Sequence, residues 1–246
     1  MFSVAYRRLS EQEWELIWAC FPDQVMGRPR KWSDRACLDA ILYLLHSGGR
    51  WGELSSDFPP KSTVHDRFSL WVKTGVLTKV FKRLRRKIAL GQVFHLDSTV
   101  KPAKRGKLVG RAVKVKGSKI SLVVDEVGLP VDLCLDAANR HDLYACRQLP
   151  HTLPKGSFIV ADRGYDANWF RRKLWNNGLK PRIPKRKKKN KKYDPIARLG
   201  RWVVERCFAW LGKFRKLEVR YEYYATHYKA FCYLACSRLL LDKLTG

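Results

Sequence analysis

The sequence predicts an α/β protein in two parts: a helical N-terminal domain, then a domain built on a mixed β-sheet with flanking helices. Two observations lead to this division. Apolar residues recur at helical spacing between residues 9 and 90, whereas short apolar runs, typical of buried strands, begin after Gly91. We therefore expect one domain over residues 1–90 and a second over residues 91–246.

The composition indicates a globular protein that binds a polyanion. The 246 residues include 50 Lys or Arg and 22 Asp or Glu, a formal net charge of +28. So large a positive surplus is typical of nucleic-acid-binding proteins. A hydrophobic content of 46% excludes a basic disordered tail. No stretch approaches the roughly 18 apolar residues of a spanning helix, so we expect no membrane partner.

The cysteines predict a reducing compartment. There are seven, an odd number, without CxxC spacing, which is typical of reduced thiols in a cytoplasmic protein. Cys232 and Cys236 lie one helical turn apart in an apolar segment, which favours core packing over a metal site. The first residues show no signal-peptide core, which agrees with a cytoplasmic location.

The N-terminal domain is expected to be helical throughout. A capping box, Ser10 to Glu13, opens the first helix, and Pro22 ends it. Further helices are expected over residues 33–45, 62–71 and 77–89, with a short piece at 51–58. The helix over 77–89 carries five cations at residues 82–87 without a compensating acid, which favours phosphate contact over a merely solvated face.

The short piece, a turn and the helix opening at residue 62 resemble a helix-turn-helix. In such a unit, the first residues of the second helix face the DNA groove. This arrangement assigns DNA contact to Lys61, Ser62, Thr63, His65 and Arg67. Many small helical bundles share the pattern without binding DNA, and that alternative stays open.

The second domain is expected to alternate strands and helices. The strands are predicted at residues 93–96, 120–124, 131–135, 158–161 and 180–183, and the helices at 141–153, 167–177, 199–214 and 227–244. Residues 128–130 (Gly-Leu-Pro) make the second and third strands a hairpin. The order β-β-β-α-β-α-β-α is that of a ribonuclease-H-like fold, a mixed sheet with flanking helices.

Three acids in this domain are candidate metal ligands. Asp97 and Asp162 each follow an apolar strand directly, and Glu205 lies at the edge of the apolar stripe of a helix, where we expect it to be poorly solvated. Carboxylates are the ligands that Mg²⁺ prefers, and two bound ions can catalyse phosphoryl transfer. The alternatives are that the aspartates cap turns and that Glu205 pairs with Arg201 one helical turn away.

The most basic run, residues 185–192, joins the fifth strand to the helix of Glu205. We interpret it as a phosphate-binding loop, with Lys185, Arg186 and Lys187 contacting DNA. A disordered tail or a targeting signal would have the same composition.

Several segments resemble those of bacterial DDE transposases, in particular the insertion-sequence-five group of the insertion-sequence-four superfamily. They are residues 96–99 (Leu-Asp-Ser-Thr), 124–130, 161–166 (Ala-Asp-Arg-Gly-Tyr-Asp) and 202–211. Residues 27–71 resemble the helical DNA-binding domain of the same proteins. His141 and Asp142 are similar to a further motif of the family, and we assign them a structural role.

The resemblance implies that Asp97, Asp162 and Glu205 form the DDE triad and bind two Mg²⁺ or Mn²⁺ ions. It also implies that Arg201 is the arginine of the motif around the glutamate. The tyrosine expected before it is Arg198, and the lysine expected after Glu205 is Gly212, with Lys213 next. We expect Arg201, Lys213 and Arg163 to contact DNA.

The implied function is a DNA transposase. It would bind the terminal inverted repeats of an insertion sequence, cleave the DNA ends and join the 3′-hydroxyl to target DNA, as a homodimer on double-stranded DNA at the bacterial nucleoid. A ribonuclease-H-like nuclease and a non-catalytic DNA-binding regulator derived from a transposase are the alternatives.

Overall fold

The computed structural model describes residues 6–23, 29–149, 153–185 and 201–246, which form two compact units that we describe separately. Residues Met1–Ile88 and Leu211–Gly246 make up the helical unit, and Ala89–Trp210 make up the sheet unit. The sequence predicts that the end of the chain belongs to the second domain. The structure instead packs it with the N-terminal helices.

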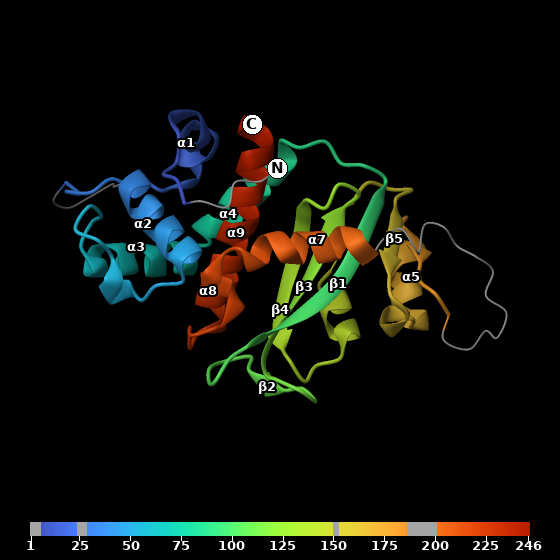
Figure 1. The fold of residues 1–246 in the computed structure, drawn as a ribbon. Helices are drawn as coiled ribbons and strands as arrows, with labels where there is room; N and C mark the ends of the chain where they lie inside the picture. The colour runs from blue at the N-terminus through green and yellow to red at the C-terminus, as the bar shows by residue number, and fades with distance from the viewer. Residues whose placement is uncertain (1–5, 24–28, 150–152, 186–200) are drawn as a thin grey trace. The chain divides into compact units, whose positions relative to one another are not determined.

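The helical unit confirms the predicted N-terminal helices. Its elements are α1 (Glu11–Ile17), η1 (Trp18–Cys20), α2 (Asp34–Ser47), η2 (Trp51–Glu53), α3 (Lys61–Thr74), α4 (Val76–Arg86), α8 (Arg215–Glu218) and α9 (Ala225–Thr245). The capping box predicted at Ser10 is present at the start of α1. Figure 1 shows α9 running among the N-terminal helices.

The amino-acid sequence of α9 explains its central position in the helical unit. Its buried residues are not confined to one stripe, and Tyr228, Phe231, Cys232 and Cys236 all lie in the core. A helix that is apolar on several sides must be covered on several sides. Contacts with α1, α2, α3, α4 and α8 provide this cover.

Two glycines that end helices give a matched test of packing in this unit. Gly48 follows α2 with φ +75° and Gly75 follows α3 with φ +72°, both left-handed. A Cβ at Gly48 would lie 2.8 Å from the Cβ of Arg215, whereas a Cβ at Gly75 would meet no described atom within 4 Å.

We therefore expect Gly75→Ala to destabilise by about 1 kcal/mol, from backbone strain alone. Gly48→Ala should cost about 1–3 kcal/mol more, because the methyl group also overpacks against α8. Urea denaturation of both variants measures the difference. Equal losses would contradict the close approach of α8 to the end of α2.

The sheet unit contains the predicted mixed sheet. Its strands are β1 (Val93–Pro102), β2 (Gly110–Arg111), β3 (Lys116–Asp125), β4 (Pro130–Ala137), β5 (Phe158–Ala161) and β6 (Lys180–Arg182). The strands lie in the order β4-β3-β1-β5-β6, and β2 also pairs with β3. β3 is antiparallel to β1 and β4, whereas β5 is parallel to β1 and β6. This order confirms a ribonuclease-H-like sheet.

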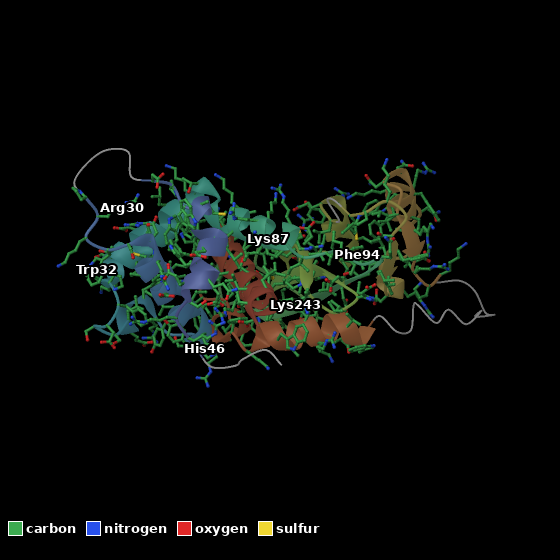
Figure 2. All side chains as sticks on the ribbon, turned by 90° about the horizontal axis from the view of Figure 1, so that it is seen from above. Arg30, Trp32, His46, Lys87, Phe94 and Lys243 are labelled. Carbon is green, nitrogen blue, oxygen red and sulfur yellow. The ribbon has the colours of Figure 1, made fainter. Side chains whose placement is uncertain are left out.

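One face of the sheet carries the main core cluster of the unit. Phe94, Leu96, Ile159 and Ala161 pack there against residues of η3 (Asp142–Arg147), η4 (Arg163–Tyr165) and α5 (Asn168–Asn176). Phe94 is fully buried and is labelled in Figure 2. In Figure 1, α7 (Arg201–Gly212) crosses the sheet on the opposite face from this cluster.

Two predicted elements of this unit differ from the observed ones. In the described part of the helix expected over residues 141–153, the structure has only the short 3₁₀-helix η3, and residues 150–152 lie outside the described residues. The strand expected to end at Leu96 continues to Pro102, because β3 pairs with it as far as Gly117. Asp97 therefore lies within β1.

Two further features of the described chain concern its cysteines and its helix lengths. All seven cysteines lie in the described part of the chain, and none forms a disulfide. No described helix is both long and apolar enough to cross a membrane.

Candidate active site

Asp97 lies on β1, and Asp162 directly follows the neighbouring parallel strand β5. β1 and β5 are in register up to the pair Leu96–Ala161, and the two aspartates directly follow that pair. Adjacent strands are about 4.8 Å apart, so the two backbones are close at this point. Because side chains alternate along a strand, both carboxylates lie on the face opposite Leu96 and Ala161, which is the face that α7 crosses.

Each aspartate also accepts a local hydrogen bond. The Asp162 Oδ1 accepts from the Gly164 N–H at 2.7 Å and caps η4, and the Asp97 Oδ1 accepts from the Ser98 N–H at 2.8 Å. A Cβ on Gly164 would lie 2.8 Å from the same Asp162 oxygen, so glycine allows this close approach. The turn-capping alternative is thus observed for Asp162, and one bonded oxygen leaves a carboxylate able to hold a cation through the other.

Glu205 lies on α7, which the turn between β3 and β4 contacts closely. The Arg206 Nη2 donates to the Val127 carbonyl at 2.7 Å, and a Cβ on Gly128 would lie 3.3 Å from the Val203 carbonyl. Val204 is buried, as predicted, but Glu205 is exposed to solvent. The expectation that its carboxylate is poorly solvated is therefore wrong, because it lies outside the buried stripe.

The structure brings the two aspartates together but does not gather a complete metal site. Among the described residues, no group of three or more His, Cys, Asp or Glu side chains could hold a metal ion. The two half-buried aspartates carry oxygen donors of the kind that a hard divalent cation such as Mg²⁺ prefers.

A buried histidine precedes the first aspartate on the same face of β1. His95 is almost fully buried, and burial lowers its pKa to about 4, so the ring is neutral at pH 7. Its Nδ1 has no hydrogen-bond partner within the described part of the chain. This histidine is not among the site residues predicted from the sequence.

A polar network lies behind Asp97, on the other face of β1. Asp142 accepts from the Ser98 hydroxyl at 2.7 Å and pairs with the Lys119 Nζ at 2.6 Å. Burial alone would raise the pKa of Asp142, but its bonds to Lys119 and Ser98 outweigh burial and lower it. His141 caps η3 by accepting from the Leu143 N–H. These contacts agree with the structural role expected for His141 and Asp142.

We expect Lys119→Met to destabilise the protein by about 1–2 kcal/mol, because Asp142 would keep its charge and lose its cation. Lys119→Arg preserves the cation and should lower the stability clearly less. Thermal unfolding at pH 7 measures both variants. An equal loss of stability in the two variants would show that the packing of the Lys119 side chain, and not its charge, stabilises the protein.

The residues predicted to bind DNA differ in their exposure to solvent. Lys61, His65, Arg163, Lys185 and Lys213 are exposed, and Thr63 is half-buried. Arg67 is buried and pairs with Asp34, so it does not face solvent as expected. Arg186 and Lys187 lie outside the described residues, and of Arg201 only the backbone, in α7, is described.

Two family models match this sequence. Residues 89–240 match the one described as "Transposase DDE domain", and residues 9–81 match "Putative transposase of IS4/5 family". A protein of Burkholderia cepacia, named "Putative transposase for insertion sequence element IS402", is 37% identical over 141 residues. That match covers 52% of this chain and 64% of the relative, slightly less than two thirds of its length.

Two further likenesses are weaker. An uncharacterised protein of Sinorhizobium fredii is 33% identical over 94 residues, which cover 37% of this chain and 74% of that protein. A piggyBac transposase synaptic complex with hairpin DNA superposes with a TM-score of 0.34 and 13% identity, over 55% of this chain and 31% of the other. A score this low carries no argument, so the fold assignment depends on the strand order.

Proposed function

This chain belongs to the family of transposases with a DDE domain, and from that membership we propose that it binds and recombines the ends of an insertion sequence. It would bind the terminal inverted repeats, cleave the DNA there and join the freed 3′-hydroxyl to target DNA. One observation carries the catalytic part. Asp97 on β1 and Asp162 at the end of β5 directly follow the paired residues Leu96 and Ala161, on the face of the sheet that α7 crosses.

The residues proposed to hold two Mg²⁺ or Mn²⁺ ions are Asp97, Asp162 and Glu205. Bound ions would supply Lewis-acid stabilisation of the entering and leaving oxygens of a phosphodiester. The chain's own part is to present carboxylate oxygens at an accessible place. Gly164 and Ser98 fix the two aspartates through backbone N–H bonds, and Glu205 is exposed on α7.

The proposed DNA contacts are the cations and polar groups predicted from the sequence, with Arg67 withdrawn because it is buried. Lys61, Thr63 and His65 start α3 in the helical unit, and Arg163 follows Asp162 in the sheet unit. Arg201, Lys213 and the basic run beginning at Lys185 complete the set. Such contacts should make binding fall steeply with salt. A homodimer on the DNA and a place at the bacterial nucleoid belong to the same proposal.

A strand-transfer assay tests this function. The chain would be incubated with Mg²⁺, a labelled duplex ending in the inverted repeat that flanks its gene, and a supercoiled target plasmid. We expect labelled ends joined to the plasmid. Cleaved ends that are never joined would indicate a nuclease, and binding without any nick would indicate a regulator. Either result would overturn the proposal.

A further inference from the structure

The helical unit contains a cavity that the proposed chemistry does not use. Its volume is about 690 Å³, within the range of pockets that bind a small planar molecule or a nucleotide. The residues that line it come from the segment 48–69 on one side and from 216–227 on the other, all within the helical unit.

The walls of the cavity are aromatic. The Trp51 ring lies 5.1 Å from the His65 ring and 5.4 Å from the Phe68 ring, and the Tyr224 ring lies 5.6 Å from the His227 ring. Tyr224 is 59% exposed. An exposed aromatic ring beside a cavity offers a face on which a flat ligand can stack.

A carboxylate at the cavity has an unused acceptor. The Glu222 side chain is only 10% exposed, and its Oε1 lies 3.3 Å from the Lys216 Nζ. Its Oε2 is buried without a hydrogen-bond partner among the described residues. A buried acceptor left unbonded is costly. Because this oxygen is buried, the side chain must rotate toward the cavity before a ligand N–H can bond to it and remove that cost.

The cavity lacks the positive surplus of the rest of the chain. The described residues that line it include two acids, Glu53 and Glu222, and two cations, Arg50 and Lys216. Burial, and then the charge of His65, lower the pKa of His227, which favours its neutral form. In a chain of net charge +28, this balance indicates a neutral ligand rather than a phosphate.

Hydrogen bonds from Arg220 hold the segment that carries Glu222 in place. The buried Arg220 donates from Nε to the Glu222 carbonyl at 3.0 Å and from Nη2 to the Tyr223 carbonyl at 3.1 Å. A site fixed in advance loses little conformational freedom on binding, which favours affinity for a small ligand.

We propose that this cavity binds one unpaired nucleobase of a DNA strand, stacked on the aromatic wall and hydrogen-bonded to Glu222, and that it prefers guanine. Guanine carries two adjacent N–H donors, N1–H and the 2-amino group, which can both reach one carboxylate. In a duplex that edge is paired, so the base must leave the stack to be bound. The proposal rests on the proposed function only for DNA as the source of the base.

Binding of short labelled oligonucleotides tests the proposal. The probes are two fluorescent pentanucleotides of thymidine with dG or deoxyinosine at the centre, measured by anisotropy with a chelator present. The probes carry the same phosphates and differ only in the 2-amino group, so backbone attraction cancels from their ratio. We expect the wild type to prefer dG about fivefold to tenfold.

Two variants and two matched controls locate the effect. Glu222→Gln should abolish the preference for dG, and Tyr224→Ala should weaken binding of both probes about tenfold by removing a stacking surface. Glu15→Gln removes an exposed acid of the same unit, and Trp18→Ala removes an exposed ring outside the cavity. Both controls should bind as the wild type does.

The proposal is overturned if the wild type does not distinguish dG from deoxyinosine, or if Glu222→Gln keeps the preference. Guanosine 5′-monophosphate is the third probe. Binding as tight as that of the pentanucleotide would assign the cavity to a free nucleotide and overturn the DNA strand as its ligand. The measurement uses neither metal ions nor cleavage, so a chain that fails to join DNA ends could still show the guanine preference.

Discussion

Replacing Asp162 by asparagine is expected to lower the rate of Mg²⁺-dependent cleavage of an end-bearing duplex by more than about 1000-fold. The affinity for that duplex should not change. Asparagine is close to aspartate in size, and its oxygen can still accept from the Gly164 N–H, so the cap of η4 is preserved. The substitution therefore removes the negative charge proposed to hold a metal ion and little else.

Single-turnover cleavage and fluorescence anisotropy measure the two quantities. Glu126→Gln is the matched control, because it removes one exposed acid from the same unit and raises the net charge equally. This control should cleave at the rate of the wild type. If Asp162→Asn cleaves normally, Asp162 has no part in the chemistry, and its role is limited to capping η4.

Glu13→Gln should lower the free energy of unfolding by about 3–5 kcal/mol. The Glu13 side chain is fully buried, and it lies 2.7 Å from Arg7 and 3.0 Å from Arg238. It also accepts from the Ser10 N–H in the capping box of α1. Glutamine leaves two guanidinium groups without this counter-charge, although Asp242 still contacts both.

The matched control is Glu11→Gln, at the other acid of the first turn. Glu11 is 72% exposed and pairs with Arg35 at the surface, so its loss should cost less than about 1 kcal/mol. Urea denaturation at pH 7 compares the two variants. Similar small losses would show that the Glu13 ion pairs contribute little to the fold of the helical unit.

The effect of Glu13→Gln should also depend on pH. Burial would raise the pKa of Glu13, but hydrogen bonds from Arg7 and Ser10 and the charge of Arg238 outweigh burial and lower the pKa below 4.5. A carboxylate with a lowered pKa stabilises the folded state above its unfolded pKa and loses that effect as the pH falls through the folded pKa. The difference between wild type and variant should stay constant at neutral pH and shrink below pH 4.5.

The ion pair between Glu13 and Arg238 also bears on how the chain divides into its two compact units. Glu13 lies near the start of the chain and Arg238 near its end, and they meet inside one compact unit. The sequence predicts α9 as an apolar helix, but helical periodicity reports only on residues within a few turns of one another. It does not show which other helices pack against α9. The helices against which such a helix packs are set by shape and by contacts between distant residues.

The two aspartates illustrate what local patterns can predict. The apolar runs before Asp97 and Asp162 indicated strands that carry an acid, and both strands exist. The alternation of apolar and polar residues in a strand, and its composition, depend on residues a few positions apart, so they can be recognised directly in the sequence. The pairing of β1 with β5 brings together residues separated by more than fifty others, and only the sheet order established it.

The wrong predictions for individual residues have the same physical cause, because burial depends on which distant elements pack together. Arg67 has a polar position at the start of α3, but α2 supplies Asp34 as its buried partner. Glu205 lies beside the apolar stripe of α7 and yet is exposed, because solvation depends on what packs against the helix. The cavity beside Glu222 likewise combines two segments that are distant along the chain.

The sequence by itself determined most of the elements, their order, the net charge and the family, because these depend on residue type and short-range spacing. Only the tertiary structure decided which elements pack together, which charges are buried, and that Asp97 and Asp162 occupy neighbouring positions of the sheet. Among the described residues, it gathers no group of three His, Cys, Asp or Glu side chains that could hold a metal ion. Burial and pairing are properties of residues that meet only when the chain folds.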